Sequence, residues 1–187
     1  MQTLAATATF NVTVVMERYP TKSRWQPAHW RVAEVLPDDG AYSAPTALAV
    51  DLVATPDVIR VAHPGFPLAI FRDEGEGYYL NINAPEPAIF VVWRLAEDAG
   101  EHLSDPAMEA LPHSLTLSYN EAARRMDAQE KVDRVPMPPE LLETLCDWVA
   151  ANYQPPQKKP RIRPQSFASK DGRYDGGMKG GMKGGMK

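Results

Sequence analysis

Arginine and tryptophan occur together near the start of the chain, where Arg24 and Trp25 are followed by Trp30 and Arg31. Both residue types are enriched at the centres of protein–protein contacts. We therefore expect these four residues to take part in binding a partner. In the alternative interpretation, the tryptophans pack in the core and the arginines pair with acidic residues of the folded body.

A basic C-terminal segment offers a second place for partner binding. Residues 1–153 hold 11 basic and 22 acidic side chains, whereas residues 154–187 hold 9 basic and 2 acidic ones. The corresponding net charges are -11 and +7, which give the -4 of the whole chain. This division predicts an acidic body and a basic arm that meets an anionic surface. A solvated tail kept soluble by its charge is the alternative.

The basic arm has two parts. Prolines alternate with basic residues over 155–164, which predicts an extended and stiff linker. The unit Gly-Gly-Met-Lys then occurs three times over 176–187, which predicts a slim, flexible strand that could enter a groove on a partner. Methionine thioethers select Cu(I), but the lysines between them repel a cation. The residues of the arm expected to bind a partner are Lys158, Lys159, Arg161, Arg163, Met178, Lys179, Met182, Lys183, Met186 and Lys187.

Residues that usually carry catalysis are scattered along the sequence. Cys146 is single and falls within an apolar helical run, so we expect it to pack in the core. No phosphate-binding or dinucleotide glycine motif occurs. The histidines have no second ligand at metal-site spacing, and they stand at His29, His63, His102 and His113. We therefore expect a protein that is not an enzyme and that binds neither metal nor cofactor.

The elements that must position these residues are mostly strands. Residues 10–17 alternate apolar and polar, which is the clearest strand pattern in the chain. Pro64-Gly65 predicts the turn of a hairpin. Glycines at 75 and 77 predict another turn, before an alternating strand. Residues 88–95 are apolar on both faces, as in a central strand. The other predicted strands cover residues 30–36, 58–62, 66–72, 78–83 and 115–119.

Two helices are predicted after these strands. Ser118 and Glu121 have the spacing of a capping box, and Asn120 is another candidate cap, so a short helix is expected over about 121–126. Pro139 suits the first position of a second helix, which we expect to run to about residue 153. Its apolar stripe consists of Leu141, Leu142, Leu145, Trp148 and Val149.

These patterns predict a mostly β, α+β fold over residues 1–153, followed by an extended tail over 154–187. The expected body is a barrel or sandwich of about seven strands closed by the C-terminal amphipathic helix, in the element order of a pleckstrin-homology-like barrel. The single cysteine indicates a reducing compartment. Residues 1–10 carry no basic, apolar leader pattern, so we expect a soluble, cytoplasmic protein without a membrane span.

Several segments resemble a bacterial family of domains of unknown function, over roughly residues 10–165. They are Arg24-Trp25 with Trp30-Arg31-Val32, Phe90 to Arg94, Leu117 to Ala123, Asp127, Glu130, Val132-Asp133, Val135 to Pro138, and Tyr153 and Pro155 with Lys158, Lys159 and Arg161. The most specific piece runs from Ser118-Tyr119-Asn120-Glu121-Ala122 to Met137-Pro138. Members of this family tend to occur with genes for molybdenum- or tungsten-dependent formate dehydrogenases.

The resemblance implies a non-catalytic accessory, assembly or maturation protein, or an associated subunit, of a cytoplasmic formate dehydrogenase. Its expected partner is a subunit of that enzyme or of the maturation machinery. The alternative is a nucleic-acid or regulatory binding module that uses the basic tail, with Phe167 and Tyr174 to stack bases. A third interpretation, a small enzyme of unfamiliar type, requires polar side chains clustered in a deep pocket.

Overall fold

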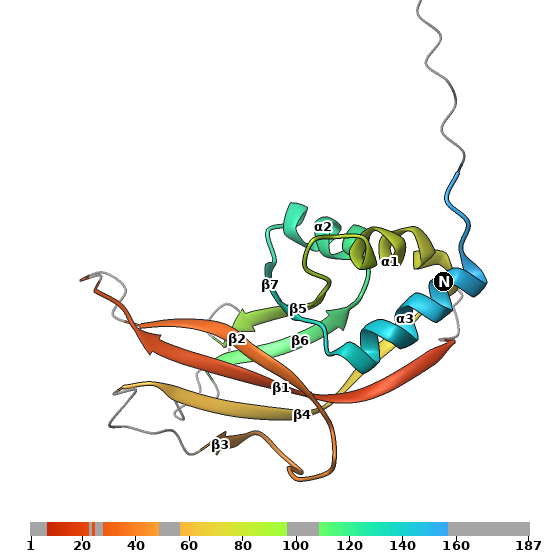
Figure 1. Cartoon of the computed structure of the whole chain (residues 1–187). Coiled ribbons are helices and arrows are strands. Elements are labelled where there is room, and N and C mark those ends of the chain that lie inside the picture. Colours follow the sequence, from red (N-terminus) through yellow and green to blue (C-terminus); the bar gives the residue numbers. More distant parts are fainter. Residues whose placement is uncertain (1–6, 23, 25–27, 49–56, 97–108, 157–187) are drawn as a thin grey trace, which may run out of the picture. The chain divides into compact units, whose positions relative to one another are not determined.

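Over the residues that the structure describes, the fold is mostly β with three α-helices (Figure 1). The computed structural model describes residues 7–22, 24, 28–48, 57–96 and 109–156. By its internal contacts the chain divides after Pro155. No helix in the described ranges is long and apolar enough to cross a membrane. The elements are β1 (Ala8–Pro20), β2 (Ala28–Pro37), β3 (Thr46–Leu48), β4 (Ile59–Ile70), the 3₁₀ turn η1 (Arg72–Glu74), α1 (Gly75–Ile82), β5 (Ala88–Leu95), β6 (Ala110–Thr116), α2 (Tyr119–Asp127), β7 (Lys131–Pro136) and α3 (Pro139–Asn152).

Four antiparallel strands form the first sheet, sheet A, in the order β2-β1-β4-β3. The strands predicted at 10–17 and 30–36 lie within β1 and β2 and are confirmed. Alternate residues of a strand face opposite sides of its sheet. On one side of β1, Val12, Val14 and Met16 accordingly enter the hydrophobic core.

The hairpin predicted around Pro64-Gly65 is wrong. Residues Ile59–Ile70 form the single strand β4, which pairs with β1 both before and after this dipeptide. The pairing register shifts at this point, so that β4 carries one more residue than β1, as in a β-bulge. Gly65 lies in the bulge with a φ of 81°, in the left-handed region that favours glycine.

Sheet B consists of three antiparallel strands in the order β6-β5-β7. Its central strand β5 is buried from Ala88 to Trp93, which confirms the strand predicted to be apolar on both faces. The strand predicted at 115–119 is confirmed in part, because β6 ends at Thr116 and Tyr119 already belongs to α2. Strand β7 was not predicted, since its six residues KVDRVP include three charged ones and a proline.

The strand predicted at 78–83 is wrong, because this segment is part of helix α1. The two glycines before it do not form a hairpin turn. A Cβ atom at Gly77 would lie 2.0 Å from Oγ of Ser118, and one at Gly75 would lie 3.1 Å from Cδ2 of Tyr153. The glycines therefore allow α1 to approach neighbouring segments closely.

Helix α1 is fixed to sheet B by the buried side chain of Asn81. Its Nδ2 donates to the carbonyl oxygens of Ala88 and Leu117, each at 2.8 Å. Its Oδ1 accepts the N–H of Ala88 at 3.0 Å. Because a buried amide is costly without partners, this arrangement satisfies Asn81 and ties α1 to the beginning of β5 and the segment after β6.

The predicted second helix is confirmed as α3, with Pro139 in its first turn. Leu145 and Val149 are buried in the core, and the partly buried Trp148 packs edge-on against Tyr78 with 5.4 Å between ring centroids. Cys146 is exposed, so the expectation that it packs in the core is wrong. It follows Leu145 by one residue, which turns its side chain by about 100° around the helix.

The two sheets share one hydrophobic core but do not form a closed barrel. Within the described residues, no strand of sheet A is hydrogen-bonded into sheet B. The Asp133 side chain links them instead, because Oδ2 accepts the N–H of Val32 at 2.8 Å. The pleckstrin-homology-like barrel is therefore not supported, whereas a sandwich-like α+β arrangement is compatible. Leu145 and Val149 of α3 enter this shared core instead of covering the end of a barrel.

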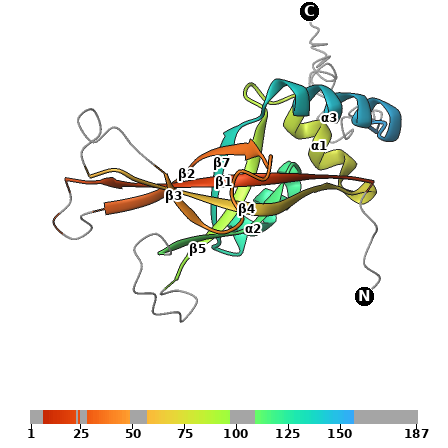
Figure 2. The same cartoon turned by 90° about the horizontal axis from the view of Figure 1, so that it is seen from below.

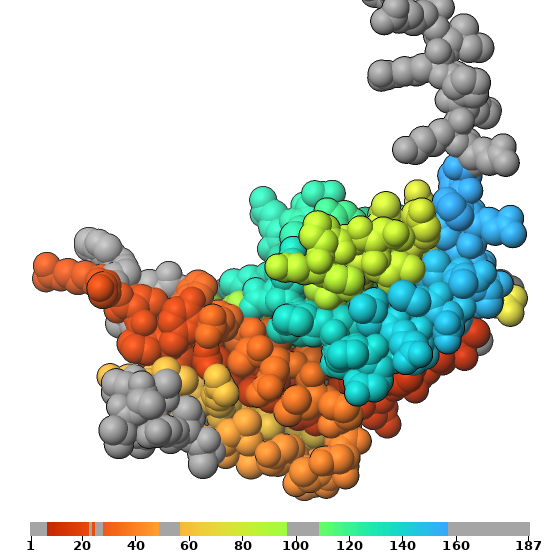
Figure 3. Space-filling view, viewed as in Figure 1, coloured from red at the N-terminus to blue at the C-terminus, as the bar shows by residue number. Residues whose placement is uncertain are grey.

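Helices α1 and α2 lie over the side of sheet B that faces away from sheet A (Figure 1). Helices α1 and α3 lie side by side in both ribbon views (Figure 2). In the space-filling view, α1 fills the space between α2 and α3 (Figure 3). The outer side of sheet B is thus covered by helices whose ends are fixed by polar contacts.

Candidate interaction surface around helix α2

Helix α2 begins at a buried cap. Ser118 is the N-cap, and its Oγ accepts the N–H of Glu121 at 3.1 Å, as the capping spacing predicted. The N–H of Ser118 in turn donates to Oγ1 of Thr116 at 3.0 Å. The start of α2 is therefore fixed to the last residue of β6.

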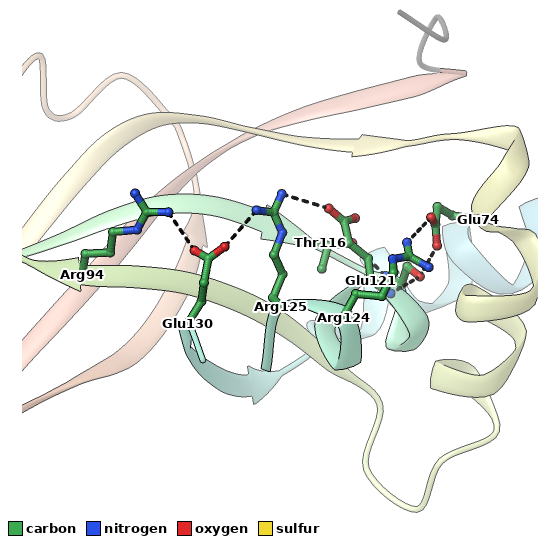
Figure 4. Close-up of polar contacts among 8 residues, drawn as sticks. Glu74, Arg94, Thr116, Glu121, Arg124, Arg125 and Glu130 are labelled. Carbon is green, nitrogen blue, oxygen red and sulfur yellow. Dashed lines mark hydrogen bonds and ion pairs between the residues drawn. The ribbon is translucent and has the colours of Figure 1, made fainter. Parts of the chain in front are cut away.

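The same serine connects α2 to the start of α1. Its Oγ donates to Oε2 of Glu74 at 2.5 Å, and Nη2 of Arg124 pairs with Oε1 of Glu74, also at 2.5 Å (Figure 4). Gly77 allows this contact, since any larger side chain would meet the Ser118 hydroxyl. Sequence reasoning found the cap but not Glu74, which is 44 residues away along the chain.

The other end of α2 is held by two further ion pairs. Nη1 of Arg125 lies 3.1 Å from Oε1 of Glu130, and Nη2 of Arg94 on β5 lies 2.9 Å from Oε2 of the same carboxylate (Figure 4). Arg125 also lies 3.6 Å from Glu121. Hydrogen bonds from Arg94 and then Arg125 lower the pKa of Glu130. Glu130 therefore stays charged and holds α2 against sheet B.

The geometry of Ser118 differs from that of an activated nucleophile. The side chain is fully buried, and its hydroxyl proton is donated to Glu74. Arg124 pairs with the other oxygen of that carboxylate, so both oxygens of Glu74 are already engaged. Nucleophilic catalysis needs a reachable nucleophile beside an available base. The contacts around Ser118 therefore fix the positions of α1 and α2.

Two other ionisable groups are buried away from solvent. Burial lowers the pKa of His63 to about 4, and Nε2 of this side chain has no hydrogen-bond partner among the residues that the structure describes. Burial likewise raises the pKa of Tyr78 to about 12, and the Tyr78 hydroxyl accepts the N–H of Phe71 at 3.0 Å. In the described part of the chain, no group of three or more His, Cys, Asp or Glu residues is placed to hold a metal ion.

An exposed apolar stripe lies on one side of α2. Tyr119 is 49% exposed and Met126 is 50% exposed, and their separation of seven residues places them on the same side of the helix. The Tyr119 ring packs edge-on against Phe90 of β5, with 6.2 Å between centroids. Arg134 lies directly opposite Phe90 on β7. We call Tyr119, Met126 and Arg134 the α2 surface.

The α2 surface has the composition of a protein interface. Tyrosine, methionine and arginine are all enriched at interfaces compared with the rest of the protein surface. A partly exposed Tyr119 also loses little conformational freedom on binding, since its ring is already held by Phe90. None of these residues was among the predicted site residues, although Tyr119 lies in the sequence segment that carries the family resemblance.

The predicted arginine–tryptophan cluster is only partly brought together. Trp30 is buried in the core, and its Nε1 donates to Glu109 at 3.1 Å, as the alternative interpretation expected. Arg31 pairs with Glu17, while Arg24 is exposed. Trp25 lies outside the described residues. The ten predicted residues of the tail, from Lys158 to Lys187, also lie outside the described residues.

Comparison with known proteins gives one match. A family model described as a protein of unknown function, DUF3305, matches residues 11–163. The matched range contains α2 and β7 and therefore the whole α2 surface. No curated protein and no solved structure matches the chain.

Proposed function

This chain belongs to the DUF3305 family of proteins of unknown function, and from this premise we propose that it is a non-catalytic protein that binds another protein through the α2 surface. The observation that carries the proposal is the exposed Tyr119–Met126 stripe on a helix fixed at both ends. A rigid helix presents these side chains without an ordering cost at the moment of binding.

The proposed partner is a cytoplasmic molybdenum- or tungsten-dependent formate dehydrogenase, or a protein of its maturation machinery. The resemblance carried by the segment from Ser118 to Pro138 supports this choice. The protein would then act as an accessory subunit or as an assembly factor, with the α2 surface selecting the partner and the basic tail adding an electrostatic contribution.

The experiment is affinity purification of the tagged full-length protein from its native host at low salt, followed by mass spectrometry. We expect a formate dehydrogenase subunit or maturation protein with the native chain. Tyr119→Gln with Met126→Gln should reduce its recovery by about tenfold or more, because exposed aromatic anchors often contribute more than 1.4 kcal/mol to binding.

A matched control variant shows whether the loss of recovery is specific to the α2 surface. Leu36→Gln removes an apolar side chain of similar exposure, 40%, on β2, and should leave recovery unchanged. If no protein of the formate dehydrogenase system is recovered, the proposed partner is wrong. If the partner is recovered equally well with the double variant, the α2 surface is not the binding site.

The charge of residues 154–187 favours a second function, namely nucleic-acid binding through the tail. Nine basic side chains in this segment could neutralise phosphates, and such binding would weaken steeply as salt rises. Deleting residues 154–187 should abolish it. The excess negative charge of residues 1–153 opposes this function, so we place it second.

A further inference from the structure

A buried carboxylate lies between two arginines on sheet A. Glu17 on β1 is directly opposite Arg31 on β2 and Arg60 on β4, because the register of sheet A pairs it with both. Glu17 is 4% exposed, whereas the side chains of Arg31 and Arg60 are 57% and 40% exposed. One buried negative charge thus anchors two positive charges at the surface.

Each guanidinium uses one edge to hold the carboxylate. Nε and Nη2 of Arg31 lie 3.0 and 2.5 Å from Oε1 of Glu17. Nε and Nη2 of Arg60 each lie 2.7 Å from Oε2. The Nη1 group of neither arginine makes a hydrogen bond to any described residue. Among the described residues, the Nη1 donors of Arg31 and Arg60 therefore stay available for a further acceptor.

The charges of this cluster do not cancel. Burial of Glu17 opposes its ionisation, but the hydrogen bonds and charges of Arg31 and Arg60 outweigh this effect and lower its pKa. At neutral pH the three side chains together carry one excess positive charge. This local excess stands in a segment, residues 1–153, whose net charge is -11.

Two ring side chains lie beside the Glu17–Arg31 pair on the same face of sheet A. Tyr19 and His29 are cross-strand partners two residues beyond Glu17 and Arg31, so all four side chains face the same side. The Arg31 guanidinium lies over the Tyr19 ring, 5.0 Å from its centroid. Tyr19 and His29 pack edge-on at 5.9 Å. Arg31 is therefore held from two directions, by a carboxylate and by a ring.

We propose that Arg31 and Arg60 form a binding site for a single oxyanion group, a carboxylate or a phosphate, on a small molecule. Fixed guanidiniums suit this chemistry, because their planar donors match the oxygen geometry of both groups. The negative charge of the surrounding segment disfavours a polyanion such as nucleic acid and admits a ligand with one anionic group. Tyr19 and His29 would contact the apolar part of the ligand.

The test is a titration of the full-length protein with inorganic phosphate and, separately, with acetate, against sodium chloride of equal ionic strength. Binding is followed by the Nε–H resonances of Arg31 and Arg60 in nitrogen–proton correlation spectra. We expect one of the two probes to shift both resonances saturably. A response to phosphate identifies a phosphate ligand, and a response to acetate identifies a carboxylate ligand.

Variants show whether the two arginines form the site. Arg60→Gln should weaken binding of the oxyanion by about tenfold or more, because the ligand loses a hydrogen bond from a charged donor. Arg31→Lys preserves the charge beside Glu17 but loses the planar fork, so it should fold normally and still bind more weakly. Arg72→Gln removes an exposed arginine of η1 that belongs to neither proposed site, and should bind as the native protein does.

Two results would overturn the proposal. One is that neither probe shifts the two resonances beyond the effect of sodium chloride. The other is that Arg31→Lys and Arg60→Gln bind as tightly as Arg72→Gln. Both results are independent of the α2 surface, since Arg31 and Arg60 lie on sheet A and Tyr119 and Met126 on α2.

Discussion

Gly77 and Ser118 approach each other so closely that a Cβ atom at position 77 would lie 2.0 Å from the Ser118 Oγ. That hydroxyl already accepts the N–H of Glu121 and donates to Glu74. It therefore cannot move away without breaking the cap of α2 or the contact with η1. The distance between α1 and α2 is set by the absence of a side chain at this position.

The first prediction is that Gly77→Ala destabilises the protein. Overpacking a filled site typically costs about 1 to 3 kcal/mol, which is offset in part by the gain of about 1 kcal/mol from replacing glycine by alanine in a helix. Because the contact at 2.0 Å is severe, we expect a cost near the upper end and a net loss of about 2 kcal/mol in the free energy of unfolding, measured by urea denaturation.

A double variant identifies the cause of that loss. Ser118→Gly removes the hydroxyl that the new methyl group would meet, so Gly77→Ala should cost less in that background than in the native protein. Gly75→Ala is the matched control, because its Cβ would meet only the Tyr153 side chain, at 3.1 Å. Equal costs for Gly77→Ala in both backgrounds would show that the Ser118 contact is not responsible.

The second prediction concerns the pH dependence of stability. Burial lowers the pKa of His63 from 6.5 to about 4, so the unfolded chain binds a proton more readily between these values. The stabilisation is therefore complete above pH 6.5 and is lost as the pH falls toward 4. We expect about 2 kcal/mol of this loss between pH 7 and pH 5, measured by chemical denaturation.

Substitution of the histidine isolates its contribution. His63→Leu should flatten the stability profile between pH 7 and pH 5, because the neutral side chain takes up no proton in either state. His113→Gln serves as the control, since His113 is an exposed residue of β6 and its loss should leave the slope in place. A slope that persists in His63→Leu would assign the pH dependence to other groups.

The third prediction compares two neighbouring positions of α3. Trp148 packs against Tyr78 beside the core, so Trp148→Ala should lower the free energy of unfolding by about 3 kcal/mol. Cys146 is exposed two residues earlier, and Cys146→Ala should change stability by less than about 0.5 kcal/mol. A loss below about 1 kcal/mol for Trp148→Ala would place the ring outside the stabilising core.

The fourth prediction is that a chain ending at Gln154 keeps its fold. Helix α3 ends at Asn152, and Tyr153 is the last of the described residues that packs against the core. We expect the melting temperature to change by less than about 2 °C, which corresponds to under about 1 kcal/mol for a domain of this size. A larger fall, measured by calorimetry, would show that residues 155–187 stabilise the body.

The sequence was most informative where a local signal determined the structure. The capping spacing of Ser118 and Glu121 predicted the helix α2, which begins at Tyr119 and not at about residue 121, and Pro139 located the start of α3, because both features act within one helical turn. The uniform apolarity of β5 was also sufficient, since it reflects a strand covered on both faces. The alternation in β1 predicted the strand but not its burial, because residues 12–17 are buried on both faces and not on one.

Elsewhere the sequence was compatible with more than one local structure, because residues far away along the chain decide between them. Pro64-Gly65 is compatible with a turn and with a bulge, and pairing with β1 selects the bulge. The glycines before α1 permit a turn or a close contact, and Ser118 selects the contact. Glu74 carries no motif that would pair it with Arg124 of α2, and Arg134 carries none that would place it opposite Phe90, the ring that holds Tyr119. The candidate surface therefore could not be predicted from spacing alone.

The shared core of the two sheets has a consequence during synthesis of the chain. Sheet A is complete once Ile70 has been made, but its inner face meets residues of β5 and α3, the last of which is Val149. At typical rates of translation this leaves roughly 4 to 16 s during which Val12, Val14 and Met16 lack their final cover. The nascent chain therefore presents an apolar sheet to the ribosome exit and to chaperones before it can close.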